Sequence, residues 1–508
     1  MNLVRNRGWS GRAAACVGLL ATAAAVHGQG RVLHVDDDAP AGGDGQSWSS
    51  AFRSLAEALQ LAQAWQAQHG GGVCLKVAQG TYVPGHPDSD RHSTFLLLSG
   101  LTLRGGFAGI NAANPDENDP GRFATVLSGD RFGDDQPGFL NRADNVLHVV
   151  TIGEPVLEPA LTGFTIRGGH ADGEGDHGRG AGIRAAHPHA SCAVVNCVIT
   201  DNYAVMGGGF ATSPVASGLT AFIGSSFVAN RAEMSGGAAW FGQAYFENCT
   251  MVSNEADHGG GAYSHGRAML AGCAVWGNTA ARGAGVYAAG GFVELTACTM
   301  VNAAAQHGND LLLAGGAAAV VRGTILAGRA PHVHVGDSCA MESWFNLAAD
   351  SLGPTLTSAT SVFVDVGSLV GSPRFADPLG LDGIAGTPDD DLRLLPNSPA
   401  IDAGVFVSPW FEEQLNLDAA GAPRVVDDPG MPNIGVGAGG AMDIGAYEFQ
   451  GVSCRADHNG DGQVGVSDIF AFLIDWFAQR ADADFDRDRQ TGVADIYGFL
   501  TAWFAGCP

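Results

Sequence analysis

Two twelve-residue segments near the C-terminus repeat one spacing of oxygen-bearing side chains. They are DHNGDGQVGVSD, residues 457–468, and DFDRDRQTGVAD, residues 484–495. A twelve-residue calcium-binding loop takes oxygen ligands at positions 1, 3, 5, 7, 9 and 12, with glycine at position 6. The expected ligands are Asp457, Asn459, Asp461, the carbonyl of Gln463 and Asp468 in the first loop, and Asp484, Asp486, Asp488, the carbonyl of Gln490 and Asp495 in the second. The spacing therefore predicts two Ca²⁺ sites.

The second loop departs from this pattern at its tight turn. Gly462 occupies the sixth position of the first loop, whereas Arg489 occupies it in the second. A side chain held in the left-handed conformation costs about 1 kcal/mol. Aspartate also ends both loops, and its short arm makes bidentate ligation harder than it is for glutamate. We therefore expect the second site to be weaker. The alternative for both segments is a solvated acidic tail.

Each loop is followed by an apolar run with helical spacing, IFAFLIDWF at 469–477 and IYGFLTAWF at 496–504. One face of each run is apolar: Ile469, Phe472, Leu473 and Trp476 in the first, and Ile496, Phe499, Leu500 and Trp503 in the second. This pattern predicts a small all-α domain over residues 451–508, made of two loop–helix units.

A turn insertion, HADGEGDHGRG at residues 170–180, concentrates groups that could act as acids or bases. Its candidates are Asp172, Glu174, Asp176 and His177, and the repeat described below is expected to bring Asp257 and His258 to the same edge, beside Arg179 and Arg282. Such a group could hold calcium or supply an acid–base pair, and an inverting glycosidase needs two carboxyl groups about 6.5–9.5 Å apart. An ordinary solvated turn is the alternative. A second acidic group, Asp382 with residues 389–391, is either a structural calcium site or a polar loop.

The segment from 195 to 312, which must position these candidates, is a repeat. NCVITDNYAVMGGGF (196–210) resembles NCTMVSNEADHGGGAY (248–263) and GCAVWGNTAARGAGVY (272–287). Three columns recur: Asn202, Asn230, Asn254 and Asn278; Gly209, Gly237, Gly261 and Gly285; and Cys197, Cys249, Cys273 and Cys298. One unit cannot bury its own apolar face, but coils stacked about 4.8 Å apart can. The repeat predicts a mainly β fold, a right-handed parallel β-helix.

Each column has an expected role in the stack. The asparagines should form a hydrogen-bonded ladder, and the glycines should supply a positive φ at a bend. The cysteines are expected to form a buried apolar stack rather than disulfides between coils. At the N-terminal end, residues 47–65 predict one amphipathic helix that caps the first coil, with Ala51, Leu55, Leu59 and Ala62 on one face. Residues 73–83 and 95–107 are expected to form the first coils.

Composition limits the partners and the location. The 508-residue chain carries a formal net charge of −26 with only 26 Lys and Arg, which argues against a nucleic-acid partner. Arg5, Arg7 and Arg12 precede an apolar run at 13–26 that is too short to span a bilayer, so residues 1–28 are predicted to be a signal peptide. We expect a protein that is secreted or displayed at the cell surface, with no transmembrane segment. Export permits disulfides, but the pairing of Cys74, Cys192 and Cys339 stays open.

Several motifs resemble those of a known group of proteins. VDDDAPAGGDGQSWSSAFRSLAEAL, VAQGTYV, LTLRGGFAG and LSGDRFGDD resemble the pectate-lyase-like (pectin-lyase-fold) β-helix proteins of planctomycete-type bacteria. DGIAGTPDDDLRLLPNSPAIDAG and DIGAYEF resemble the module that closes such helices, the choice-of-anchor Q domain. The resemblance implies a β-helix with its N-terminal cap over 31–375 and a closing segment over 376–450. It carries over no catalytic residues: DHG at 176–178 and 257–259 is similar to part of a polygalacturonase motif whose companion motifs are absent.

The two loop–helix units resemble a dockerin, an EF-hand-like module that binds cohesin modules when calcium is present. The resemblance implies a disulfide between Cys454 and Cys507, and Gly506–Cys507 is similar to the end of Gly-Cys-type dockerins. The expected function is a secreted modular protein whose β-helix engages polysaccharide or another extended extracellular ligand, tethered through its dockerin to a cohesin-bearing partner. The alternatives are a polysaccharide lyase or glycoside hydrolase, and a non-catalytic adhesive or structural surface protein.

Overall fold

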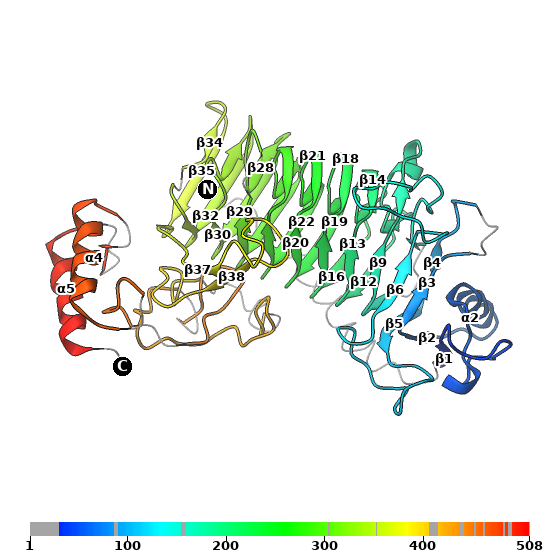
Figure 1. The fold of residues 1–508 in the computed structure, drawn as a ribbon. Helices are drawn as coiled ribbons and strands as arrows, with labels where there is room; N and C mark the ends of the chain where they lie inside the picture. Colours follow the sequence, from blue (N-terminus) through cyan, green and yellow to red (C-terminus); the bar gives the residue numbers. More distant parts are fainter. Residues whose placement is uncertain are drawn as a thin grey trace. The chain divides into compact units, whose positions relative to one another are not determined.

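The computed structural model describes residues 30–506 except 86–89, 154–158, 303–304, 352, 406–414, 437–440, 452–453, 461–462, 481–482 and 486–489. The predicted signal peptide and Cys507 therefore lie outside the described residues. The chain divides into two compact units. One comprises the residues up to Met269 together with Asn278–Gly291, and the other comprises Leu270–Gly277 together with Phe292–Pro508. Figure 1 shows that short strands make up most of the chain, with two helices near the C-terminus.

The first unit is a stack of parallel coils. Its strands are β1 (Arg31–Val35), β2 (Val73–Ala78), β3 (Gly80–Tyr82), β4 (Phe95–Leu97), β5 (Leu101–Phe107), β6 (Thr125–Ser128), β7 (Val150–Ile152), β8 (Ala160–Thr162), β9 (Thr165–Arg167), β10 (His170–Ala171), β11 (Ile183–Ala185), β12 (Cys192–Val195), β13 (Val198–Thr200), β14 (Tyr203–Met206), β15 (Phe210–Thr212), β16 (Thr220–Ile223), β17 (Ser226–Val228), β18 (Arg231–Ser235), β19 (Ala239–Glu247), β20 (Thr250–Val252), β21 (Glu255–His258), β22 (Ala262–Ala271), β24 (Thr279–Arg282) and β25 (Val286–Ala289). The parallel register of Val198 with Ser226, and of Ser226 with Thr250, repeats the intervals of the sequence. The predicted parallel β-solenoid is confirmed.

The asparagine column forms the predicted ladder. The Oδ1 atom of each lower asparagine accepts both the backbone N–H and the side-chain amide of the one above: Asn230 from Asn202 at 3.2 and 3.0 Å, Asn254 from Asn230 at 2.9 and 3.0 Å, and Asn278 from Asn254 at 3.0 and 2.9 Å. All four side chains are buried. Because every amide is satisfied along the stack, the ladder fixes the register of one coil on the next.

The expectation for the glycine column is wrong. The positive φ angles lie one or two residues earlier, at Gly207 (66°) and Gly236 (71°). Gly209 and Gly237 are needed for a different reason, because an added Cβ would lie 2.6 Å from the carbonyl oxygen of Ala238 and 2.4 Å from that of Gly260, respectively. These glycines allow successive coils to approach closely.

The cysteine column is a buried stack, as predicted. Cys197, Cys249, Cys273 and Cys298 are all free thiols and are all buried. Cys74, Cys192 and Cys339, whose pairing was open, are free as well. Cys454 is disulfide-bonded, and its partner is not among the described residues.

The N-terminal cap differs from the predicted single helix. A 3₁₀ turn at Trp48–Ser50 is followed by α2 (Leu55–His69), which begins eight residues later than predicted because Ser54 caps it by accepting the Glu57 N–H. The predicted apolar residues Leu55, Leu59 and Ala62 are buried all the same. A strand also precedes the expected first coils, since β1 pairs in parallel with β2.

The second unit continues with parallel coils and then a loop-rich segment. Its elements are β23 (Ala274–Trp276), β26 (Phe292–Thr296), β27 (Thr299–Val301), β28 (Leu311–Ala314), β29 (Ala318–Arg322), β30 (Ile325–Leu326), β31 (Val333–Val335), β32 (Ala340–Trp344), β33 (Leu347–Ala348), β34 (Thr355–Leu356), β35 (Val362–Val366), β36 (Leu369–Val370), β37 (Phe375–Asp377), β38 (Asp391–Leu394), α4 (Val466–Phe477) and α5 (Val493–Ala505). Among the described helices, none is both long and apolar enough to cross a bilayer.

The segment expected to close the helix packs against its side. Leu394, Ala400, Ile401 and Ile444 form one buried cluster with Ile325 on β30 and Leu347 on β33. Buried carboxylates hold its loops, because Asp443 accepts the N–H groups of Asp402 at 2.8 Å and Phe449 at 2.6 Å. Burial raises the pKa of Asp443. The described part of this segment therefore covers an outer face of the coils.

Candidate functional site

The insertion carries the candidate acids on a short 3₁₀ turn. This turn spans Gly175–Gly178. Arginines hold both aspartates of the insertion: Asp172 pairs with Arg91 at 2.9 Å, and Asp176 pairs with Arg179 at 2.7 Å and with Arg184 at 3.0 Å. These ion pairs fix the positions of both carboxylates on the turn, and both side chains stay partly exposed.

The predicted convergence of two groups of acids does not occur. The backbone register at this edge runs through consecutive coils in the order Arg179, Met206, Ser235, His258 and Arg282. Arg179 and His258 are therefore three coil spacings apart, about 14 Å at the usual interstrand distance. Asp257 contacts its neighbour His258 at 3.2 Å. The sequence placed these residues correctly on one edge, but they lie along the stack and do not form a compact site.

A different row stands on the neighbouring outer face of the first unit. In β11, β15 and β19, Arg184 is in register with Ala211, which is in register with Trp240. The Ala239 N–H donates to the Gly261 carbonyl at 3.1 Å, so β22 lies one coil beyond β19. On β22, Tyr263 is in register with Tyr287 of β25. Arginine or aromatic side chains thus occupy this position in four of five successive coils, with Ala211 in the remaining one, and Trp240 among them is buried.

The aromatic rings of this row are in contact with other rings and with cations. The rings of Tyr263 and Tyr287 stack with centroids 5.1 Å apart and planes 16° from parallel, and His258 meets Tyr287 edge-on at 5.5 Å. The Arg179 guanidinium lies 5.5 Å from the Trp240 ring centre, where a cation–π attraction operates. Because the tyrosine rings stack along the coil axis, they offer their edges to the outside of this face.

Histidines border the arginine end of the row. His148 is buried, its Nδ1 lies 3.1 Å from the Gly180 carbonyl, and its Nε2 lies 3.5 Å from a guanidinium nitrogen of Arg184. Burial, followed by the charge of Arg184, lowers the pKa of His148 to about 3. The imidazole is therefore neutral, with Nδ1 donating to Gly180 and Nε2 facing Arg184. The ring of His177 lies 6.4 Å from that of His148 and 4.9 Å from that of His92.

Reasoning from the sequence missed this row, although a signal was present. Tyr263 and Tyr287 each follow the glycine column by two residues, at Gly261 and Gly285, and Trp240 follows Gly237 by three. Strands alternate inward and outward side chains, so a large residue at this offset faces outward repeatedly. These aromatic residues carry no carboxylate and were not among the predicted site residues.

The first C-terminal loop is closed by a buried carboxylate. Asp468 is fully buried, and its two oxygens accept the N–H groups of Asn459 at 3.1 Å and Gly465 at 2.7 Å. Asp457 Oδ1 accepts the Gly460 N–H at 2.9 Å. The helix that follows, α4, begins at Val466, three residues before the predicted start. Asp461 lies outside the described residues, whereas Gln463 lies within them.

The second loop repeats this closure. Asp495 is buried, and its oxygens accept the N–H groups of Phe485 and Gly492, both at 2.6 Å. The predicted ligands Asp484 and Gln490 are described, whereas Asp486, Asp488 and the departing Arg489 are not. In both loops the twelfth residue ties the loop to the start of its helix, and the described donors are carboxylate and amide oxygens of the kind that Ca²⁺ prefers. These residues therefore fit a calcium ion.

Two further acidic groups lie elsewhere in the chain. Carboxylate oxygens of Asp130, Asp134 and Asp144 come within 4.8 Å of one another, and the sequence reasoning did not single them out. In the predicted cluster, Asp389 accepts the Leu381 N–H at 2.7 Å and Asp390 accepts the Gly386 N–H at 2.6 Å. The carboxylates of that loop cap its own turns, in keeping with the polar-loop alternative.

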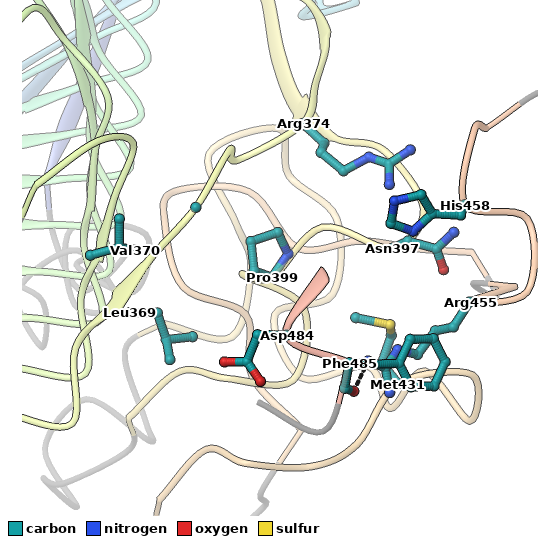
Figure 2. A pocket seen from close by; sticks show the side chains of 11 residues that line it. Leu369, Val370, Arg374, Asn397, Pro399, Met431, Arg455, His458, Asp484 and Phe485 are labelled. Atoms are coloured by element: carbon teal, nitrogen blue, oxygen red, sulfur yellow. Dashed lines mark hydrogen bonds between the residues drawn. The ribbon is translucent and has the colours of Figure 1, made fainter. Parts of the chain in front are cut away.

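A small pocket lies in the second unit beside the two C-terminal loops. Figure 2 shows Arg374, Arg455, His458 and Asp484 around it, and Arg455 donates to the Phe485 carbonyl. Its volume is about 70 Å³. A cavity that binds benzene measures about 150 Å³, so this pocket is too small to enclose a sugar ring.

Comparison with known proteins gives one named neighbour. No family model matches the chain, and no curated protein matches it. The chain is similar to a pectate lyase. The crystal structure of pectate lyase Pel9A aligns with a TM-score of 0.39 and 12 % sequence identity, over 83 % of this chain and 96 % of the lyase chain.

Proposed function

We propose that the parallel β-solenoid binds an extended polysaccharide along the outer face that carries Arg184, Trp240, Tyr263 and Tyr287. The single observation behind this proposal is the recurrence of aromatic and arginine side chains at one outward position of successive coils. Guanidinium and phenol groups at this face can hydrogen-bond to the hydroxyl groups of sugars. A solenoid repeats such a position along its axis, which suits a repeating polymer.

The test is binding of the full-length protein to a panel of acidic and neutral polysaccharides by affinity electrophoresis. Tyr263→Ala and Tyr287→Ala are expected to weaken retardation by the bound polymer, each by at least several-fold. Phe132→Ala is the control, because Phe132 is an exposed aromatic residue that lies off this row. If all three variants were retarded as strongly as the parent protein, the binding site would lie outside this row.

Degradation of the polymer is the second candidate activity. It is favoured by the candidate acid–base groups Asp172, Asp176 and His177, which stand next to the arginine end of the row. A lyase would release unsaturated ends that absorb ultraviolet light, whereas a hydrolase would release only reducing ends. Asp176→Asn distinguishes a catalytic carboxylate from an ion-pair partner, because it should abolish turnover and leave polymer binding intact. A non-catalytic adhesive protein would release neither product.

We further propose that residues 451–508 bind calcium and tether the secreted protein to a cohesin-bearing partner. In support, each helix has a second apolar face that is at least 60 % exposed: Val466, Phe470, Ile474 and Phe477 on α4, and Val493, Tyr497 and Phe504 on α5. Apolar side chains exposed in this number are typical of interaction surfaces.

The tether is tested by surface-immobilised cohesin modules. The full-length protein is expected to bind at least one of them in the presence of calcium and to dissociate when EGTA is added. Phe470→Asp combined with Tyr497→Asp should abolish this binding without changing calcium affinity, since both side chains are exposed and neither belongs to the expected ligands. Binding that survives both EGTA and the double substitution would refute the tether.

A further inference from the structure

The last coil of the second unit has an open backbone edge. Its longest strand, β35, runs VFVDV and pairs in parallel with β32 along its whole length, from Val362 opposite Ala340 to Val366 opposite Trp344. No other strand within the described ranges is in register with β35. The N–H and C=O groups on its second edge are therefore available for pairing with another chain.

The side chains of this coil are exposed in a way that interior coils are not. The outward residues Val362, Val364 and Val366 are 46, 48 and 37 % exposed. Val370 on β36 follows the same register column as the buried Met300, Leu326 and Ala348, yet it is 39 % exposed. The described part of the closing segment packs on the side of the coils, where Leu369 of this coil contacts it, and the three valines of β35 stay exposed.

The edge carries none of the usual protection against strand pairing. Edge strands are commonly blocked by lysine, proline or a bulge, and β35 has none of these. Its one charged residue, Asp365, is held by hydrogen bonds from Ser343 Oγ at 2.7 Å and Ser368 Oγ at 2.5 Å. Asp365 is in register with the buried Ser343, so its carboxylate lies on the inner side of the strand, away from the outward valines.

The first strand of the first unit shows the opposite arrangement. The outer edge of β1 is occupied by the chain's own residues 45–52, because His34 N–H donates to the Gly45 carbonyl at 2.8 Å and Phe52 N–H donates to the His34 carbonyl at 2.9 Å. A β35 edge therefore cannot add to the β1 edge of another copy. The partner edge that a second copy can offer is its own β35.

We propose that two copies of this chain pair through their β35 strands about a two-fold axis that passes near Val364. Antiparallel pairing about that residue sets Val364 opposite itself and Val362 opposite Val366 of the other copy, so that valine meets valine along the outer face. Such an interface is isologous and closes at two copies, since each chain contributes the same edge.

Sedimentation velocity of the full-length protein over a range of concentrations tests the proposal. A monomer–dimer equilibrium is expected. High salt should shift it toward the dimer, because salt screens the repulsion between two copies that each carry a net charge of −26. Val364→Lys should shift the equilibrium at least tenfold toward monomer. Val32→Lys is the matched control, since Val32 is 42 % exposed on the covered strand β1.

A cysteine placed on the axis tests the geometry independently of affinity. Val364→Cys should form an intermolecular disulfide under mild oxidation, because directly opposed Cβ atoms in an antiparallel pair lie about 4.5–5.5 Å apart. Val32→Cys should stay monomeric under the same conditions. A parent protein that is monomeric at every concentration, or a dimer that Val364→Lys leaves unchanged, would overturn the proposal, as would assembly beyond two copies.

Discussion

The rings of Phe472 and Phe499 stack with centroids 4.3 Å apart and planes 3° from parallel. The two residues occupy equivalent positions on α4 and α5, so the stack joins the two loop–helix units face to face. The two tryptophans make equivalent hydrogen bonds across the two units: Trp476 donates to the Gly492 carbonyl at 2.7 Å, and Trp503 donates to the Gly465 carbonyl at 2.8 Å. Each helix therefore holds the loop of the other unit.

This exchange predicts that the two calcium loops depend on each other. Removal of calcium with EGTA should unfold both helices together, because metal binding contributes folding free energy in such loops. Hydrogen exchange by mass spectrometry should show loss of protection at 466–477 and 493–505, with little change in the β-solenoid. Asp468→Ala should expose both helices as well, and exposure of α4 alone would contradict the coupling.

The departure at Arg489 predicts unequal calcium sites. Asp461→Ala should weaken calcium binding in titration calorimetry more than Asp488→Ala, because a non-glycine residue at the tight turn already penalises the second loop. Asn111→Ala, an exposed substitution outside the loops, serves as the control for folding. Equal losses of affinity in the two aspartate variants would contradict the argument.

The asparagine ladder predicts a large cost for a single deletion. Asn254→Ala would leave the buried N–H and side-chain amide of Asn230 without their acceptor and should lower the free energy of unfolding by about 3 kcal/mol. Chemical denaturation measures this loss. Asn111→Ala should change it by less than about 0.5 kcal/mol, and similar values for the two variants would show that the ladder does not stabilise the fold.

In the second unit, a buried asparagine is bound to ionisable groups, which predicts a pH dependence. The N–H and amide of Asn302 both reach Asp310 Oδ1, at 3.0 and 3.3 Å, and buried His332 then bridges Asp310 at 3.1 Å and Asp350 at 2.7 Å. Burial lowers the pKa of His332, but its hydrogen bonds to the two aspartates and their charges outweigh this effect, and the pKa rises above 6.5.

A histidine with a raised pKa stabilises the fold fully below its ordinary value of 6.5 and loses this contribution as the pH rises through the raised value. The difference in thermal midpoint between the parent protein and His332→Gln should therefore be largest in mild acid and shrink in mild base. His69→Gln, at an exposed histidine, is the control. A difference that is constant with pH would mean that His332 acts through packing alone.

The sequence predicts the coils well because their period is visible in single residues. Asn202 to Asn278 repeat at the spacing of the strand register, and a buried amide ladder leaves little freedom at those positions. The side-packing of the closing segment was not foreseen. One outward register column carried a signal for this packing, because Thr299 is followed there by the apolar residues Ile325, Leu347 and Leu369. A row of apolar side chains at an outward position has to be covered by another segment.

The candidate site was harder to predict for a geometric reason. Asp176 and Asp257 belong to similar turns, but similar turns in a solenoid are spread along its axis, and the intervals in the sequence had to be converted into coil spacings to see the separation. The aromatic row was overlooked because Trp240, Tyr263 and Tyr287 have no acid–base chemistry of their own. Their importance comes from recurring at one outward position, which only the register reveals.

The most direct test of the account is one assay of the full-length protein on acidic and neutral polysaccharides, with binding, reducing ends and ultraviolet absorbance followed together in calcium and in EGTA. The account predicts that at least one polymer binds and that binding is lost in Tyr263→Ala combined with Tyr287→Ala, whether or not product is released. A protein that binds no polymer, or whose double variant binds as tightly as the parent, would contradict it.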